Sequence, residues 1–349
     1  MIAQAPQTTS LGERASSPEN IDGFGRTISY LRISLTDRCN LRCLYCMPAE
    51  GMTFMHPSHY LRREELNTVL RVAVQMGIRK IRFTGGEPTL RPELVEIVRD
   101  TRSIEGVEEI ALSTNAVLLD RKAAALKEAG VDRVNISLDT LRPDRFRQMT
   151  RLGNIEKVFA GIRAAWEVGM RPLKINTVVM RGQNDDEIGQ LAALTQRYPI
   201  EVRFIEYMPI GVSYEAWRAS FVPAAEILRA CEQNGVLIHV PQERYSGPAE
   251  RYQYMGAPGK IGVIHAVSTS FCGYCNRIRM TADGLFKPCL HSDHVFDVKE
   301  ALRMRGEEGV RDVLRHVLRK KPLQHHMQVP EGALANTRYS RLNMSQMGG

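Results

Sequence analysis

The chain has 349 residues, 43% of them hydrophobic, and 47 Lys and Arg against 39 Asp and Glu leave a formal net charge of +8. This length exceeds one ordinary domain and fits a barrel with an appended domain. The basic excess favours an anionic partner, but charge alone does not choose among nucleic acid, acidic lipid and a phosphorylated small molecule. No apolar stretch approaches the ~20 residues of a membrane-spanning helix, and the polar N-terminus lacks the apolar core of a secretory signal. We therefore expect a cytoplasmic protein.

Short β-rich runs alternate with amphipathic helical stretches between Tyr30 and Glu206. The pattern predicts strands at residues 31–35, 80–84, 109–114, 133–138, 174–180 and 201–205, and helices at 64–76, 91–99, 121–129, 155–168 and 185–196. Six βα units in succession require a parallel sheet with right-handed crossovers. Six are too few for an ordinary eight-stranded barrel, so we predict an α/β fold with a partial (βα)6 TIM-like barrel.

The pattern changes after Glu206, where prolines interrupt a looser segment. We expect a helix at 224–233, strands at 260–267, 277–281 and 285–289, and two basic helices near 298–305 and 309–319. The predicted organisation is therefore a disordered tail (1–23), the partial barrel (24–210), a C-terminal α+β domain (211–336) and a C-terminal tail (337–349).

Three cysteines, Cys39, Cys43 and Cys46, follow the first predicted strand with the spacing C-x3-C-x2-C. They lie at the carboxyl end of that strand, where α/β barrels build their sites. Clustered thiols in a chain without an export signal indicate metal rather than disulfides. Three thiolates on a [4Fe–4S] cluster leave one iron open, which is typical of a reactive site. The alternative is zinc, which normally takes four ligands; the nearest other candidates are His56 and His59.

A second group of three cysteines, Cys272, Cys275 and Cys289, has the spacing C-x2-C-x13-C. A second Fe–S cluster in the C-terminal domain, with an open iron that binds a substrate, is the sharper interpretation. The neighbouring imidazoles of His291 and His294 keep a zinc site as the alternative.

Two arginines follow Cys275 on a predicted strand. Because side chains alternate along a strand, Arg277 and Arg279 share one face. Paired guanidinium groups beside a metal site suit a polyphosphate, since they bind phosphate oxygens in a bidentate manner. A solvated strand face is the alternative interpretation.

The C-x3-C-x2-C spacing, with Tyr45 inside it, resembles the radical S-adenosylmethionine superfamily. The resemblance extends to three further strand ends, at Gly85-Gly86-Glu87-Pro88, residues 135–139 and residues 206–209. It implies a partial (βα)6 barrel in which the open iron chelates S-adenosylmethionine. One electron from the cluster then cleaves the sulfonium bond and releases a 5′-deoxyadenosyl radical.

The segments taken together resemble the GTP 3′,8-cyclase family of molybdenum cofactor biosynthesis over roughly residues 24 to 349. They are TDRCNLRCLYCMP, TGGEPTLR, NISLDT, RFIEYMP, FCGYCNRIRMTADGLFKPCL and the terminal Gly-Gly. The resemblance implies a lyase with two [4Fe–4S] clusters and GTP between them. The radical would remove hydrogen from C3′ of the ribose, and C3′ would attack C8 of guanine to give (8S)-3′,8-cyclo-7,8-dihydroguanosine 5′-triphosphate.

Matched residue by residue, the resemblance assigns contacts to both ligands. The expected GTP contacts are Arg32, Arg82, Ser113, Lys174, Arg277 and Arg279, and the expected S-adenosylmethionine contacts are Tyr45, Gly86, Ser137 and Met208. Lys80 and Arg203 are further candidates for the basic lining, and Gly348 and Gly349 are expected to reach into the site. Buried Lys and Arg are rare without an anion, which agrees with a charged ligand among these strands. One departure is Ala116, which stands where the family usually has Gly.

The resemblance also implies partners. We expect a reductant such as flavodoxin or ferredoxin, a downstream cyclic pyranopterin monophosphate synthase that receives the product, and a homodimer, with no nucleic-acid or membrane partner. Two alternatives stay open at this point: a radical S-adenosylmethionine enzyme that modifies peptides and has an auxiliary cluster, and a basic protein with two zinc sites that binds nucleic acid.

Overall fold

A computed structural model describes residues 19–210, 214–241, 247–269, 271–292, 294–325 and 347. In these residues one sheet of twelve strands has the order β12-β11-β10-β1-β2-β3-β4-β5-β6-β9-β8-β7. Its central strands are β1 (Tyr30–Ser34), β2 (Lys80–Thr84), β3 (Glu109–Thr114), β4 (Arg133–Ser137), β5 (Lys174–Val179) and β6 (Glu201–Glu206). All neighbouring pairs from β1 to β6 are parallel, as the βα alternation predicts.

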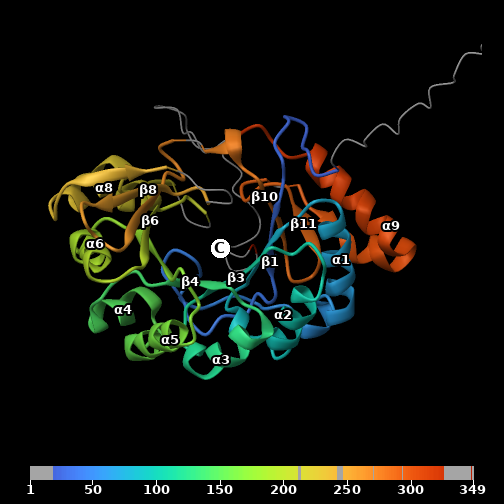
Figure 1. The fold of residues 1–349 in the computed structure, drawn as a ribbon, viewed down its shortest axis with the longest axis horizontal. Coiled ribbons are helices and arrows are strands. Elements are labelled where there is room, and N and C mark those ends of the chain that lie inside the picture. Colours follow the sequence, from blue (N-terminus) through green and yellow to red (C-terminus); the bar gives the residue numbers. More distant parts are fainter. Residues whose placement is uncertain are drawn as a thin grey trace, which may run out of the picture.

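Helices cover the outer face of this curved sheet (Figure 1). They are α1 (Arg63–Gln75), α2 (Leu94–Arg102), α3 (Leu119–Ala129), α4 (Pro143–Thr150), α5 (Ile155–Glu167) and α6 (Ile188–Arg197). The structure therefore confirms the α/β fold with a barrel of six βα units. No helix among the described residues is both long and apolar enough to cross a membrane.

Alternation along the strands separates the hydrophobic core from the inner face of the barrel. Ile81 and Phe83 of β2 are fully buried in the hydrophobic core. Arg82 lies between them in sequence, so its side chain leaves the sheet on the opposite face. Parallel register places Arg82 beside Arg32 of β1, and Arg32 beside Arg279 of β10 (Arg277–Met280). The strands thus bring basic side chains from distant parts of the chain to one inner surface.

The C-terminal part of the chain continues the barrel sheet at both edges. Strand β9 (Lys260–Ile264) pairs in parallel with β6, and β10 pairs in parallel with β1. Antiparallel strands follow on each side: β8 (Glu250–Tyr254) and β7 (Leu237–Val240) beyond β9, and β11 (Leu285–Lys287) and β12 (Phe296–Asp297) beyond β10. The predicted C-terminal α+β region therefore shares its sheet with the barrel.

The helices of the C-terminal part are α7 (Tyr214–Ser220), α8 (Ala224–Glu232) and α9 (Val298–Arg319). Helix α9 packs against α1 (Figure 1). Its backbone is non-helical at Gly306, with φ 59° and ψ −141°, so two helical stretches meet there at a kink. The sequence predicts two basic helices at these positions, and the kink at Gly306 separates them.

Residues 19–23 are packed against the fold, which corrects the expectation of a disordered tail as far as residue 23. Asn20 and Asp22 are buried, and Glu19 forms ion pairs with Arg311 and Arg315 of α9 at 2.7 and 2.6 Å. The polar composition of this segment suggests exposure, but Glu19 and Asn20 bond to distant residues and Asp22 bonds to the nearby Arg26.

Candidate active site

The first cysteine group, Cys39, Cys43 and Cys46, lies in the loop after β1 and lines a cavity that we call the first cavity. Burial raises the pKa of Cys39 to about 11 and that of Cys43 well above its usual range. A buried thiol with a raised pKa stays protonated unless a cation stabilises the thiolate. The donor set therefore fits a metal group, whose positive charge would supply that stabilisation.

Two glycines after β2 let the neighbouring loop approach the first cysteine group closely. A Cβ on Gly86 would meet the Arg38 carbonyl oxygen at 2.2 Å, and one on Gly85 would meet the Thr36 carbonyl oxygen at 2.6 Å. The Gly86 amide donates to the Thr36 carbonyl at 2.7 Å, and the Glu87 amide donates to the Arg38 carbonyl at 2.7 Å. Only a residue without a side chain fits such backbone contact.

Glu87, in the wall of the first cavity, joins the ends of β2 and β3. Its buried carboxylate accepts hydrogen bonds from the Thr89 amide (3.1 Å) and hydroxyl (2.6 Å), the Thr114 hydroxyl (2.7 Å) and the Asn115 amide (2.7 Å). Burial outweighs these contacts and raises the pKa of Glu87. The Asn115 side chain in turn donates to Asn40 at 2.7 Å, beside Cys39. Glu87 is therefore a structural link between two strand ends and the cysteine loop.

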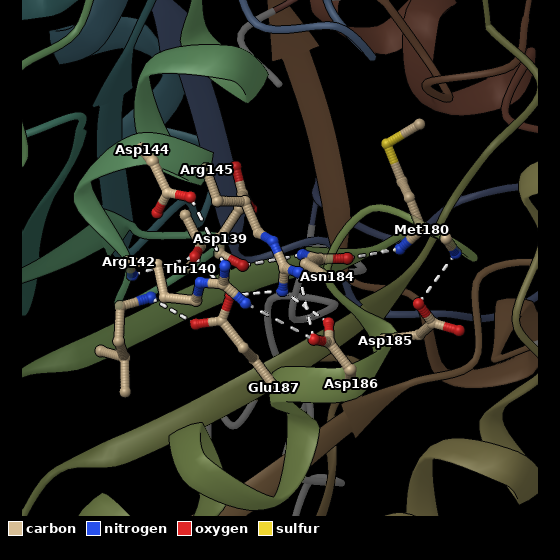
Figure 2. A network of polar contacts seen from close by, with 12 residues as sticks. Asp139, Thr140, Arg142, Asp144, Arg145, Met180, Asn184, Asp185, Asp186 and Glu187 are labelled. Carbon is tan, nitrogen blue, oxygen red and sulfur yellow. Dashed lines mark hydrogen bonds and ion pairs between the residues drawn. The ribbon is translucent and has the colours of Figure 1, made fainter.

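Tyr45 is fixed by a polar network at the end of β4. Its hydroxyl donates to Asp139 Oδ2 at 2.8 Å, while Asp139 Oδ1 accepts from the Val178 amide at 2.9 Å. Burial raises the pKa of Asp139 to about 6. Figure 2 shows Asn184 beside Asp139, whose backbone oxygen accepts from the Asn184 side chain at 2.7 Å. Glu187 accepts from the Thr140 hydroxyl and the Leu141 amide, so β4, β5 and η3 (Asp185–Glu187) together hold this loop.

The four residues that the resemblance assigns to S-adenosylmethionine lie together. Tyr45, Gly86, Ser137 and Met208 all line the first cavity with the first cysteine group. Ser113, expected among the GTP contacts, lines this cavity as well, and Arg82 Nη1 lies 3.4 Å from its hydroxyl oxygen.

A second cavity adjoins the first and contains most of the expected basic residues. Its wall includes the second cysteine group, Cys272, Cys275 and Cys289, together with Arg32, Lys80, Arg82, Arg203, Arg277 and Arg279. Asn176, Ile205 and Met208 line both cavities. The two cysteine groups therefore face adjoining cavities that share residues of β5, of β6 and of the segment after β6.

Positive charge dominates the second cavity. Burial, to which neighbouring positive charges add, lowers the pKa of Arg32 and Arg82 to about 9 and that of Lys80 to about 8. Glu109 offsets part of this charge, since its Oε1 lies 3.0 Å from Lys80 Nζ and 2.7 Å from Arg133 Nε. Buried cations that depress one another's pKa favour an anionic ligand, which would relieve both their desolvation and their repulsion.

Lys174 lies at the start of β5 and is not part of the described wall of either cavity. Its ammonium group contacts Glu201 Oε2 at 2.8 Å, and Arg203 occupies the other oxygen of the same carboxylate. Burial, with the charge of Arg203 adding to it, lowers the pKa of Lys174 to about 6. A ligand that reaches Lys174 has to compete with Glu201.

The second cysteine group differs electrostatically from the first. Burial alone would raise the pKa of Cys275, but Arg277 and Lys321 outweigh it and lower the pKa to about 6. Cys275 is therefore largely a thiolate at neutral pH, which is the form that binds metal. Across the described residues, no three His, Cys, Asp or Glu side chains converge on a position for a single metal ion. A cubane cluster does not need such convergence, because each thiolate binds a different iron.

Gly348 and Gly349, which were expected to reach into the site, lie outside the described residues. Met347 is buried, and its carbonyl accepts a hydrogen bond from Arg279 Nη1 at 3.1 Å, so this one position near the C-terminus contacts the wall of the second cavity.

Ala116 is buried with φ 61°, a left-handed conformation that glycine adopts more easily.

Comparison with known proteins matches two family descriptions in succession: "Radical SAM superfamily" over residues 33–195 and "Molybdenum Cofactor Synthesis C" over residues 200–327. The GTP 3′,8-cyclase of Listeria welshimeri is 45% identical over 332 residues, which cover 94% of this chain and 98% of that protein. The GTP 3′,8-cyclase of Heliobacterium modesticaldum is 45% identical over 331 residues, which cover 94% of this chain and 100% of that protein. The GTP 3′,8-cyclase of Pelotomaculum thermopropionicum is 46% identical over 331 residues, which cover 94% of this chain and 99% of that protein. The chain belongs to the GTP 3′,8-cyclase family.

Solved structures of lower identity share the fold with this member of the family. Streptococcus suis SuiB aligns with a TM-score of 0.56 at 15% identity, covering 87% of this chain and 68% of SuiB. SuiB bound to S-adenosylmethionine aligns with a TM-score of 0.53 at 16% identity, covering 78% of this chain and 62% of SuiB. These likenesses agree with the barrel described above.

Several polar residues of the site lie outside the sequence expectations. Arg133 of β4 and Asn176 of β5 line the cavities, and Glu109 and Glu201 hold the basic side chains. Asn135, which belongs to the expected strand end at residues 135–139, also lines the second cavity. The signal that could have found them is strand alternation, because each of them is next to at least one buried apolar residue of its strand, such as Val134 or Ile175.

Proposed function

We propose that this protein is a GTP 3′,8-cyclase, a radical S-adenosylmethionine lyase that converts GTP to (8S)-3′,8-cyclo-7,8-dihydroguanosine 5′-triphosphate. This reaction would be the first step of molybdenum cofactor biosynthesis. The observation that carries the proposal is the pair of adjoining cavities, each with three cysteines in its wall, which share Asn176, Ile205 and Met208. Radical transfer requires that the radical and its target lie close together, and adjoining cavities would allow that.

In the first cavity, Cys39, Cys43 and Cys46 would hold a [4Fe–4S] cluster, which when bound supplies the electron that cleaves S-adenosylmethionine. Tyr45, Gly86, Ser137 and Met208 would bind and orient S-adenosylmethionine. The link from Tyr45 to Asp139 at 2.8 Å and the tight contact of Gly86 with the cysteine loop fix the positions of two of these residues. Such fixed positions are what holds a reacting bond close to its target.

In the second cavity, the basic residues would bind the triphosphate of GTP. Arg32, Lys80, Arg82 and Arg203 are buried or nearly so in its wall, where hydrogen bonds from charged donors to phosphate oxygens are strong. Lys174 would join them if the triphosphate displaces Glu201. The second cysteine group would hold a second [4Fe–4S] cluster, with Arg277 and Arg279 beside it.

The proposal includes partners and a location. A reductant such as flavodoxin or ferredoxin would supply the electrons, and a cyclic pyranopterin monophosphate synthase would receive the product from this enzyme. We also propose a homodimer in the cytoplasm, where a reducing environment keeps clustered thiols available for metal.

The test is anaerobic reconstitution followed by iron and sulfide analysis and a turnover assay. Two [4Fe–4S] clusters predict about eight irons per chain, whereas two zinc sites predict colourless protein that contains zinc. The reduced protein should then form 5′-deoxyadenosine from S-adenosylmethionine in step with loss of GTP. Absence of that coupling refutes the assignment. Arg277→Ala should weaken GTP binding while the cleavage of S-adenosylmethionine persists.

A further inference from the structure

Arg26 lies in the N-terminal segment that precedes the barrel, and its side chain is buried. Asp22 holds it in place: Asp22 Oδ1 accepts from the amides of Phe24 (2.9 Å) and Arg26 (3.0 Å), and Asp22 Oδ2 accepts from Arg26 Nε at 2.6 Å. The carboxylate thus closes a turn over residues 22–26, in which Gly25 has φ +79°. The turn aims the remaining guanidinium donors of Arg26 away from its own segment.

Those donors reach two segments about 250 to 300 residues away in the chain. Arg26 Nη1 donates to the carbonyl of Cys272 at 2.7 Å and to that of Leu323 at 2.9 Å, and Arg26 Nη2 donates to the carbonyl of Pro322 at 2.7 Å. The Cys272 carbonyl also accepts from the Cys275 amide at 3.1 Å. Arg26 therefore binds the first residue of the second cysteine group directly and connects it to the segment after α9.

Lys321, in that same segment, contacts Cys275 and the residue that precedes Cys289. It is buried, and its ammonium group donates to the carbonyls of Arg277 at 2.8 Å and Pro288 at 3.0 Å and lies 3.5 Å from Cys275 Sγ. Pro288 directly precedes Cys289 in the sequence. Three acceptors around one ammonium group satisfy its three donors, so Lys321 fixes two cysteine-bearing segments relative to each other.

We propose that Arg26 and Lys321 are positioning residues that hold the second cysteine group in the arrangement that binds its cluster. The inference rests on the proposed function, because it takes Cys272, Cys275 and Cys289 as cluster ligands. Four segments of the chain, around residues 22–26, 272–277, 288–289 and 321–323, meet through these two side chains. Buried positive charge next to thiolates also favours an anionic cluster, since partners behind the ligands tune both affinity and potential.

The test removes each side chain and counts iron. Arg26→Gln shortens the side chain and removes its charge and most of its donors, and Lys321→Met keeps the length without the ammonium group. After anaerobic reconstitution, both variants should lose about four of about eight irons per chain. They should keep the electron paramagnetic resonance signal of the first cluster and the GTP-independent cleavage of S-adenosylmethionine.

Matched control variants carry the same substitutions at positions whose polar contacts are exposed. Arg181→Gln removes an exposed ion pair with Glu226 (2.8 Å), and Lys299→Met removes an exposed hydrogen bond to the His59 carbonyl (2.7 Å). Both controls should retain the full iron content. The thermal unfolding midpoint of the metal-free protein, measured for all four variants, separates a loss of cluster binding from a loss of fold.

Three outcomes overturn the proposal. Full iron content in Arg26→Gln and Lys321→Met, with two clusters in the wild type, overturns the positioning role alone. Loss of both clusters together with a lower unfolding midpoint assigns the two side chains to general support of the fold. Wild-type protein with about four irons overturns the second cluster itself, and with it both the proposed function and this inference.

Discussion

Replacing Gly86 with Ala would test the contact between the two loops that form the first cavity. In the native chain the backbone of Gly86 lies directly on the segment that leads into Cys39, and the Gly86 amide donates to the Thr36 carbonyl at 2.7 Å. An added Cβ would lie 2.2 Å from the Arg38 carbonyl oxygen, 2.5 Å from the Arg38 carbonyl carbon and 2.6 Å from the Asp37 carbonyl oxygen. All three obstacles are backbone atoms, so no side-chain rotation can relieve them.

The magnitude follows from the size of the required shift. Ordinary contacts begin near 3.4 Å, so the Cβ is 1.2 Å too close to the Arg38 oxygen and the two loops must separate by about that much. Overpacking of this kind costs about 1–3 kcal/mol of unfolding free energy. A displacement of about 1 Å in a positioned reactant can lower a rate about 100-fold. We therefore expect a large loss of S-adenosylmethionine cleavage with a smaller loss of stability.

The assay measures 5′-deoxyadenosine from S-adenosylmethionine after dithionite reduction, at matched iron content. Gly189→Ala is the control, because the nearest atom to its Cβ would be 3.6 Å away and a helical Ala stabilises by up to ~1 kcal/mol relative to Gly. A Gly86→Ala protein that cleaves S-adenosylmethionine within about threefold of the wild type, well short of the about 100-fold loss expected from such a displacement, would refute the reasoning.

Three further predictions concern charge, backbone strain and a buried carboxylate. Burial lowers the pKa of Lys174 to about 6, and a bound triphosphate would favour the charged ammonium group. The affinity for GTP should therefore weaken above pH 6, by up to about tenfold per pH unit. Calorimetry should show that a proton is taken up when GTP binds. A pH-independent affinity between 6 and 8 contradicts this. Ala116→Val places a β-branched side chain at φ 61° and should lower the unfolding free energy by about 2 kcal/mol in denaturant titrations. Ala116→Gly should change the unfolding free energy by less than about 1 kcal/mol. Equal effects of the two substitutions would argue against backbone strain at this position. Glu87→Gln replaces one acceptor oxygen with an NH2 group, which then faces a donor such as the Asn115 amide. The unfolding free energy should fall by about 1–3 kcal/mol in the same titrations. An unchanged unfolding midpoint would show that the four hydrogen bonds are not needed.

The barrel could be predicted from the sequence because its signals are local and periodic. Helices expected to end before Gly77, Gly130 and Gly169 do so, and these glycines have φ of 110°, 115° and 73°. The strands β2 and β3 match the expected ranges. Helix α4 and strands β7 and β8 were not expected, since short elements are specified largely by their packing partners, as for β8 between β7 and β9.

Sequence reasoning selects candidate site residues where residue type and spacing carry the chemistry. Both cysteine groups and the basic residues of β1, β2 and β10 line the two cavities, and their roles as ligands stay predictions. Arg26 and Lys321 were missed for a physical reason: each donates mainly to backbone carbonyls, which every residue has, so no pattern marks their partners. Only the folded chain reveals that these distant segments meet.

The pairing of β1 with β10 and of β6 with β9 bears on how the protein is made. During synthesis the ribosome releases β1 to β6 well before residues 260–280, so both edges of the nascent barrel wait for strands that are still to come. Unpaired parallel edges invite pairing with other chains, and long-range pairing is slow to form. The two regions that match separate family descriptions, 33–195 and 200–327, share one sheet, and we expect them to fold as one unit. A chain cut after β6 should aggregate rather than yield a minimal radical-generating domain.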